Sequence, residues 1–132
     1  MGKIFKIGMK ASLTKTITEA DIILCSGISL DTNPIHLNEE YAKKTIFKKR
    51  IAHGLLANGL ISAVLGTKLP GEGSIYLEQN TKFLKPVYIG DTITAIVEII
   101  EIQEKKIILS TICINQNNEK IIEGIAKILK KI

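Results

Sequence analysis

The hydrophobic and polar positions divide the chain into a first half that predicts helices and a second half that predicts strands. The longest apolar stretch runs over residues 53–69 with the sequence HGLLANGLISAVLGTKL. Its hydrophobic side chains cover nearly the whole circumference of a helix, which is typical of a helix that other elements enclose on most sides. Residues 69–73, LPGEG, predict the end of this helix, because proline and glycine are the poorest helix formers.

A strand and a helix are predicted near the N-terminus. Residues 11–17, ASLTKTI, contain enough β-branched side chains to predict a strand. Thr18 followed by Asp21 resembles a capping box, in which each side chain satisfies a backbone N–H group near the other residue. Residues 18–27, TEADIILCSG, therefore predict a helix that ends at Gly27.

A loop and a short helix are predicted before the apolar stretch. Residues 29–36 contain Asp, Asn and Pro, which favour turns. Pro34 fixes its own φ angle and restricts the backbone of Asn33, so this loop can hold its side chains in a fixed relation. Asn38 then predicts the N-cap of a short helix within residues 37–45, LNEEYAKKT.

After the apolar helix the pattern changes to runs rich in Ile, Val and Thr, which predict strands. Residues 74–91 predict a strand that ends in a proline-containing turn. Residues 92–106 and 107–118 predict a β-hairpin around the charged turn EKK. The last segment, KIIEGIAKILKKI at 120–132, is ambiguous. Its isoleucine spacing favours a helix, whereas Gly124 and the isoleucines also permit a strand.

One fully apolar helix followed by several long antiparallel strands predicts an α+β fold. In such a fold a curved sheet wraps around the helix and both bury their apolar surfaces. The 132 residues suit a single domain over 1–132 with a core large enough to fold without disulfides or metals. No repeat, low-complexity segment or linker divides the chain.

The composition and charge argue against a nucleic-acid-binding protein. Hydrophobic residues make up 45% and charged residues 23% of the chain, which is ordinary for a globular protein. The net charge of +5 is spread along the chain, and only three Tyr and three Phe are present. Nucleic-acid binders cluster their charge on one face, often with exposed aromatic side chains. A mildly basic surface suits a phosphorylated small molecule or an acidic carrier protein.

The sequence also predicts a cytoplasmic protein that does not cross a membrane. The N-terminal stretch MGKIFKIGMK lacks the continuous apolar region of a signal peptide. The longest uncharged stretch, 51–67, is short for a membrane span and contains His53, Asn58 and Ser62. Two cysteines, Cys25 and Cys113, are too few for a metal framework, and their apolar surroundings predict buried, reduced thiols.

The candidate chemistry begins in the stretch SLDTNPIHLNEEYA, where Asp31 and His36 are five positions apart. In one interpretation, Asp31 belongs to an ordinary turn and His36 lies at the surface before a helix. In the other, the two side chains form an acid/base pair, because an imidazole accepts a proton near neutral pH. Residues 51–71 contain no Asp or Glu, so a catalytic carboxylate beside the apolar helix has to come from elsewhere, and Asp31 is the candidate.

The start of the apolar helix supplies a second candidate. The first backbone N–H groups of a helix have no partner inside it, so the N–H of Gly54 can bind an oxyanion. Equally, Gly54 can serve close packing of the helix. Ser62 either supports a ligand or donates to the carbonyl four residues earlier, as serines in apolar helices usually do. His53 is interpreted as a packed histidine in preference to a catalytic base.

At this point the residues resemble a known family. Residues 31–56, DTNPIHLNEEYAKKTIFKKRIAHGLL, resemble the hydratase signature of the MaoC-like (R)-specific enoyl-CoA hydratases, with its Asp-x-Asn-Pro-x-His core. The resemblance extends from about Ser12 to the C-terminus. It implies the hot-dog fold, in which an antiparallel sheet wraps around a central helix, and a homodimer. It also makes the ambiguous C-terminal segment the last strand. One departure is Lys48, where relatives often have glycine, which leaves the local loop shape open.

The resemblance implies the reversible syn addition of water to trans-2-enoyl thioesters of CoA or acyl carrier protein. Asp31 and His36 would be the catalytic dyad, without a metal or redox cofactor. The N–H of Gly54 would donate to the thioester oxygen and Ser62 would support it. Asn33 and Leu65 would contact the substrate. The product would be the (R)-3-hydroxyacyl thioester.

Three other functions remain open at this stage. The first is a 3-hydroxyacyl-carrier-protein dehydratase of fatty-acid synthesis, which uses the same chemistry on another carrier. The second is a hot-dog acyl thioesterase, which often takes a carboxylate from the central helix; this helix has none. The third is a non-catalytic acyl-thioester sensor that keeps the pocket without needing Asp31 and His36.

Overall fold

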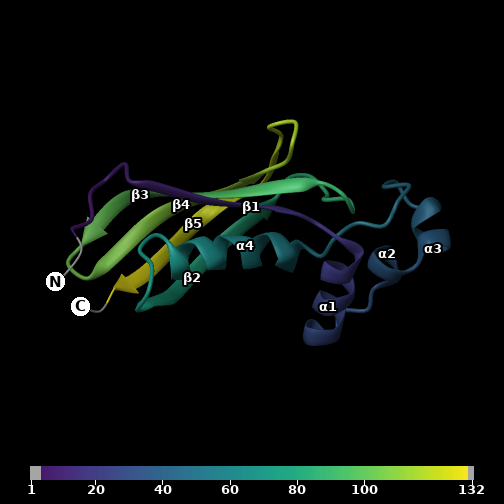
Figure 1. Ribbon diagram of the computed structural model, residues 1–132, viewed down its shortest axis with the longest axis horizontal. Helices are drawn as coiled ribbons and strands as arrows, with labels where there is room; N and C mark the ends of the chain where they lie inside the picture. Colours follow the sequence, from purple (N-terminus) through teal and green to yellow (C-terminus); the bar gives the residue numbers. More distant parts are fainter. Residues whose placement is uncertain (1–3, 131–132) are drawn as a thin grey trace.

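Within residues 4–130, five antiparallel strands form one sheet in the order β1-β3-β4-β5-β2 (Figure 1). The computed structural model describes residues 4–130, so the ends of the predicted 1–132 domain, including the first residues of the N-terminal stretch and Ile132, lie outside it. The strands are β1 (Lys10–Thr16), β2 (Ser74–Phe83), β3 (Thr92–Gln103), β4 (Lys106–Ile114) and β5 (Lys120–Lys130). The predicted strands and the hairpin of β3 and β4 are therefore confirmed.

Among the described residues, four helices accompany the sheet: α1 (Glu19–Ser29), α2 (Pro34–Leu37), α3 (Glu39–Lys43) and α4 (Gly54–Thr67). The predicted apolar helix is α4, which lies along one face of the sheet. The other three helices gather beyond its N-terminal end (Figure 1). The candidate site residues from the first half of the chain therefore lie near the start of α4.

The hydrophobic core lies between α4 and the sheet. On α4, Ala57, Ile61, Val64 and Leu65 are buried. Residues of β3 alternate between buried and half-buried positions, and the buried set is Ile93, Ala95, Val97 and Ile99. This alternation is the period-2 pattern of a strand with one face on a core. The α+β prediction is confirmed.

The opposite face of α4 remains open in the single chain. Leu55 is 57% exposed, and Gly59, Ser62 and Gly66 are exposed as well. These positions recur every three or four residues, so they form one stripe along the helix. The sequence predicted that other elements enclose this helix on most sides. In the single chain the sheet covers one side of it, and the opposite side is open.

Two predictions about the first half need correction. The capping box of Thr18 and Asp21 is present, but α1 continues past Gly27 to Ser29. The helix ends where Leu30 adopts a left-handed backbone with φ 65°, a conformation that usually falls to glycine. Residues 34–36, predicted as loop, belong to the short helix α2, because Pro34 suits the first turn of a helix and Asn33 caps it.

The C-terminal segment is strand β5, so the helix favoured by isoleucine spacing was wrong and the strand implied by the resemblance is confirmed. β5 pairs with β4 on one side and with β2 on the other. Gly124 serves this pairing, since a Cβ atom there would lie 1.9 Å from the carbonyl oxygen of Asn80. Within residues 4–130, none of the helices has the length and apolar character needed to cross a membrane.

Candidate active site

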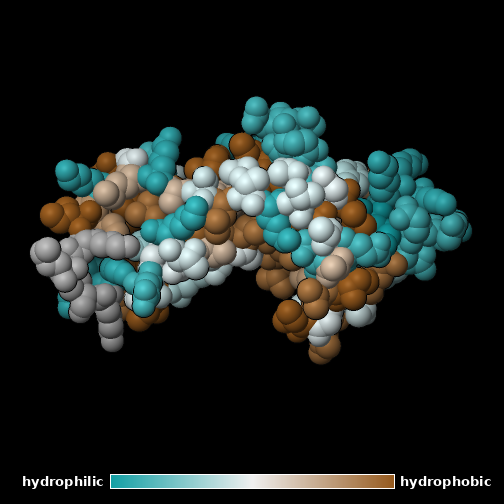
Figure 2. All heavy atoms as spheres, viewed as in Figure 1, coloured by the Kyte–Doolittle hydropathy of each residue, from teal (hydrophilic) through white to brown (hydrophobic). Residues whose placement is uncertain are grey.

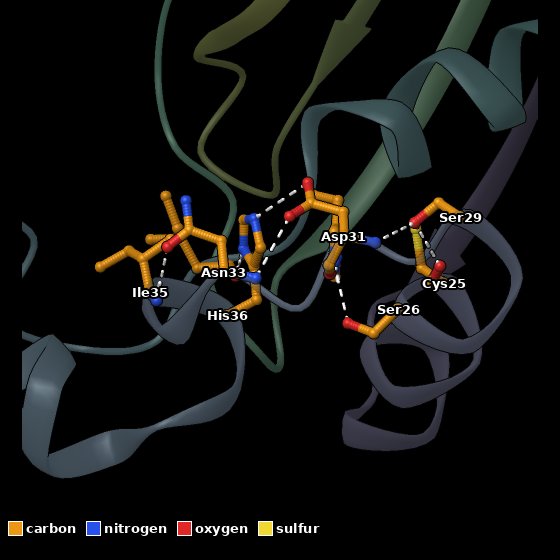
Figure 3. A network of polar contacts seen from close by, with 9 residues as sticks. Cys25, Ser26, Ser29, Asp31, Asn33, Ile35 and His36 are labelled. Atoms are coloured by element: carbon orange, nitrogen blue, oxygen red, sulfur yellow. Dashed lines mark hydrogen bonds and ion pairs between the residues drawn. The ribbon is translucent and has the colours of Figure 1, made fainter.

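Asp31 lies directly after the left-handed turn that ends α1. Its backbone N–H donates to Ser29 Oγ at 3.2 Å, and its carboxylate oxygen Oδ1 accepts from the N–H of Asn33 at 3.2 Å (Figure 3). The predicted Asx turn is therefore present. It holds one oxygen of the carboxylate and leaves the other, Oδ2, facing the ring of His36.

His36 lies in α2 and is held by the segment that precedes α4. Its Nδ1 atom lies 2.8 Å from the carbonyl oxygen of Ile51. A carbonyl oxygen only accepts hydrogen bonds, so Nδ1 carries the hydrogen, and the neutral ring has its lone pair on Nε2. The buried side chain of Arg50 donates from Nε to the carbonyl oxygen of His36 at 2.6 Å and pairs with Glu19 at 2.7 Å.

The two members of the predicted dyad face each other. His36 Nε2 and Asp31 Oδ2 are 3.8 Å apart, which is too long for a direct hydrogen bond. A water oxygen with hydrogen bonds of about 2.8 Å to both atoms would subtend roughly 85° between them, so one water fits both groups. The His36 side chain is 9% exposed and that of Asp31 is 51% exposed. The pair thus lies at the boundary between the interior and the solvent.

His53 brings a second imidazole against this pair. The rings of His36 and His53 are stacked, with centroids 3.8 Å apart and planes inclined by 24°. Ligand atoms of Asp31, His36 and His53 lie within 4.8 Å of one another, close enough to suggest a metal site. The lone pairs of an imidazole lie in the ring plane, so those of stacked rings run side by side and do not converge on one ion. The geometry therefore favours acid/base chemistry.

Gly54 is the first residue of α4, and a groove of about 520 Å³ lies beside it. The groove is mainly apolar and is lined by His36, Phe47, Ile51, Gly54, Phe83 and Leu84, among others. A Cβ atom on Gly54 would lie 2.5 Å from Cε1 of Phe83. Both interpretations of Gly54 therefore keep support: it packs closely against Phe83, and its N–H lies at a helix N-terminus beside His36.

Ser62 lines a second groove of about 520 Å³ between α4 and β2. The two grooves share Leu55, so they adjoin at the first turn of α4. Ser62 is exposed there, close to Asn58 and Tyr76 in the lining. A ligand that extends from Gly54 along α4 would pass this hydroxyl.

The two residues expected to bind the substrate have other roles in the single chain. Asn33 caps α2, because its Oδ1 accepts from the N–H of Ile35 at 3.2 Å. Leu65 is 1% exposed and belongs to the hydrophobic core, so it offers no surface to a ligand here. The sequence reasoning missed Arg50 and Ile51, and nothing in the local pattern marks them, since their contacts to His36 span 14 and 15 residues.

Lys48, the departure from the family pattern, has a left-handed backbone with φ 66°. Glycine adopts this conformation without steric cost, whereas other L-residues pay roughly 1–2 kcal/mol. The loop therefore keeps the shape that glycine would favour, at some cost in stability.

Residues 4–121 match the family model described as MaoC like domain. The chain is 52% identical over 125 residues to the (R)-specific enoyl-CoA hydratase of Rhodospirillum rubrum, covering 94% of this chain and 87% of that one. It is 41% identical over 130 residues to the 3-hydroxybutyryl-CoA dehydratase of Methylorubrum extorquens, covering 96% and 82%. The solved structure of an (R)-hydratase from A. caviae involved in PHA biosynthesis superposes with a TM-score of 0.95 at 36% identity, covering 98% of this chain and all of that one.

Proposed function

The chain belongs to the family of MaoC-like domains, with their hot-dog fold, and on that premise we propose that it is an (R)-specific enoyl-CoA hydratase. It adds water reversibly to trans-2-enoyl thioesters and is thus a hydro-lyase. The observation that carries this proposal is the placement of Asp31 and His36, 3.8 Å apart, beside the groove at the start of α4. The whole chain, 1–132, acts as one domain.

The reaction first needs a polarised thioester carbonyl, so that Cβ becomes electrophilic. The N–H of Gly54 supplies a donor with no partner inside the helix, and the helix dipole adds positive potential at the same end. Losing one such donor typically costs roughly 2.7–4 kcal/mol of activation free energy. Ser62 supports the bound acyl group from the next groove along α4.

The second need is an oriented and deprotonated water. Because the carbonyl of Ile51 keeps the hydrogen of His36 on Nδ1, Nε2 can accept a proton from the water as its oxygen attacks Cβ. The Asp31 carboxylate orients the same water. The new hydroxyl group on Cβ lies between the two side chains, so it accepts the proton back from His36 and donates its own to Asp31, which passes it to Cα. Both side chains then return to their starting states. Delivery of OH and H from one side gives syn addition, and with the facial choice of the family the product is the (R)-3-hydroxyacyl thioester.

For the carrier we propose CoA, which is named for the relatives at 52% and 41% identity, whereas relatives named for acyl carrier protein are only 32% and 33% identical. An acyl-carrier-protein dehydratase would use the same dyad and groove. The two are separated by comparing kcat/KM for one enoyl chain on CoA and on acyl carrier protein. A preference for the protein-bound chain would reassign the substrate but leave the reaction class unchanged.

We also propose that the protein acts as a homodimer. β2 is an edge strand with a free side, and it exposes Ile75 and Leu77 at 41% and 43%. The stripe on α4 is open, and hydrophobic side chains of α1 gather on the surface (Figure 2). An uncovered apolar edge strand favours pairing with another chain. Sedimentation should give twice the chain mass, and Leu77→Lys should shift it toward the monomer.

The decisive assay follows trans-2-enoyl-CoA substrates of four to twelve carbons, with chiral analysis of the product. Asp31→Asn and His36→Gln should each lower kcat by roughly 10²–10⁴-fold, the usual contribution of general acid/base groups. Glu40→Gln is the control, since this carboxylate on α3 is 81% exposed and pairs with Lys43. Near-normal hydration by either dyad variant would contradict the assignment.

The same assay distinguishes the two functions of another kind. A thioesterase would release free acid and free thiol in place of the hydroxyacyl thioester. A sensor would bind enoyl-CoA without turnover, and its affinity would not change in Asp31→Asn or His36→Gln. Either outcome would replace the hydratase proposal.

A further inference from the structure

His53 is buried, and the acid/base mechanism described above does not use it. The residue is 3% exposed and occupies the N-cap position of α4, yet its side chain makes no capping hydrogen bond. Asp, Asn, Ser and Thr are the usual N-cap residues, because their short side chains accept from the first N–H groups of the helix. Capping therefore does not explain a histidine at this position.

The Nε2 atom of His53 contacts the backbone of Asp31. It lies 2.9 Å from the carbonyl oxygen of Asp31 and 3.0 Å from Ser26 Oγ. A carbonyl oxygen only accepts, so Nε2 of His53 carries the hydrogen and donates it. This bond ties the loop that carries Asp31 to the residue next to Gly54, across 22 positions of sequence.

The ring face of His53 contacts the other member of the dyad. The rings of His36 and His53 are stacked with centroids 3.8 Å apart. His36 is already held at Nδ1 by Ile51, and that single bond leaves the ring free to tilt about it. The face of His53 restricts this tilt, and so fixes the direction in which Nε2 of His36 points.

Among side chains of this size, only an imidazole makes both contacts at once. A phenyl ring keeps a flat face but has no donor, whereas a glutamine amide keeps a donor near the Nε2 position but has no ring. The imidazole also has a drawback, since within residues 4–130 its buried Nδ1 atom has no hydrogen-bond partner. A buried acceptor without a partner destabilises a fold, so a residue chosen for packing alone would not be histidine.

We propose that His53 is a positioning residue, which holds Asp31 through its backbone carbonyl and His36 through its ring face, and so sets the geometry of the dyad relative to Gly54. The inference rests on the proposed hydratase function for its kinetic test. The contacts of His53 can be tested without turnover. A failure of the positioning proposal is therefore distinguishable from a failure of the hydratase function.

The contact test uses the fact that the chain has only two histidines. In protein labelled with ¹⁵N-histidine and freed of any histidine tag, long-range ¹H–¹⁵N spectra show two ring systems, and His53→Gln assigns the remaining one to His36. We expect opposite neutral tautomers, with the hydrogen on Nδ1 in His36 and on Nε2 in His53. A hydrogen on Nδ1 of His53 in the neutral ring would overturn the proposal.

The kinetic test compares His53→Phe, His53→Gln and His53→Ala on crotonyl-CoA, per folded site as judged by thermal unfolding. A misplacement of about 1 Å can cost roughly 10²-fold, so we expect His53→Ala to lower kcat by about that factor. KM should stay near the wild-type value, because the groove beside Gly54 is untouched. His53→Phe and His53→Gln each keep one contact, so their kcat values should lie between those of wild type and His53→Ala.

Ser26→Ala is the matched control, because Ser26 Oγ contacts Nε2 of His53 but, within residues 4–130, makes no hydrogen bond to the side chain of Asp31 or His36. It should leave kcat unchanged. Wild-type kcat in a folded His53→Ala, or a loss confined to KM, would overturn the positioning role. An inactive wild-type protein that still shows the two expected tautomers would overturn the hydratase function and leave the contacts standing.

Discussion

Replacing Gly54 by alanine separates its two interpretations, close packing and oxyanion binding. The substitution keeps the backbone N–H but adds a methyl group at the mouth of the groove. That Cβ atom would lie 2.5 Å from Cε1 of Phe83 and 3.0 Å from its Cδ1. Carbon atoms in contact are about 3.5–4.0 Å apart, so the phenyl ring has to move by roughly 1 Å.

The movement of Phe83 should cost little stability. The side chain ends β2 and is 60% exposed, so its ring can swing outward. We expect Gly54→Ala to lower the free energy of unfolding by about 1 kcal/mol or less, near the range of surface substitutions. In the reaction, the methyl group keeps the thioester oxygen away from the N–H. Loss of one such donor lowers kcat by roughly 10²–10³-fold.

The assay measures kcat/KM on crotonyl-CoA and the urea midpoint for Gly54→Ala, Phe83→Ala and the double variant. Gly27→Ala is the control, since Gly27 lies inside α1 and a Cβ atom there meets no described atom within 4 Å, and it should raise stability by about 0.5–1 kcal/mol. If the loss persists in the Phe83→Ala background, the methyl group itself blocks the donor. Full activity in Gly54→Ala, or full rescue by Phe83→Ala, would refute the oxyanion role.

Three further predictions concern single side chains. Ser62→Ala should lower kcat/KM by about fivefold, the equivalent of one hydrogen bond of about 1 kcal/mol, in the same crotonyl-CoA assay. Burial raises the pKa of the Cys113 thiol to about 12, so it should react with a thiol reagent at pH 8 only after unfolding. Burial opposes ionisation of Asp21, but bonds from Thr18 and Lys15 outweigh it and lower its pKa. The stabilisation by the ionised Asp21 carboxylate is present above its pKa in the unfolded state. It is lost as the pH falls through its lower pKa in the folded state. Asp21→Asn should therefore cost about 1 kcal/mol in urea at pH 7 and progressively less toward pH 3.

Much of the fold was predictable because its elements have strong local patterns. The alternation of β3 and the apolar length of α4 both follow from single stretches of sequence. The end of α1 was not predictable in this way, because Leu30 takes the left-handed position that glycine usually occupies. β5 was misjudged from periodicity, since it is a buried strand whose isoleucines face both sides of the sheet, and such runs resemble helices.

The candidate site was predictable to the extent that it is local. Asp31 and His36 lie five positions apart in one stretch with Pro34 between them, which made them candidates, and the resemblance to the family then implied that they form the dyad. The position of Leu65 shows where the sequence reasoning fell short. It lies four residues after Ile61, on the same side of α4, and Ile61 faces the core. That spacing alone would have placed Leu65 in the core.

The remaining contacts of the site join segments that are distant in the sequence. They determine which nitrogen of His36 carries the hydrogen in the proposed reaction. His36 acts as a base at Nε2 only if its hydrogen stays on Nδ1, and the carbonyl of Ile51 keeps it there. Ile51 is placed in turn by its bridge to Tyr88 and by the bond from the N–H of Ala52 to the carbonyl of Val87 at 2.7 Å. The motif around Asp31 therefore marks the reacting groups that we propose, whereas the turn before β3 helps determine which nitrogen of the imidazole carries no hydrogen.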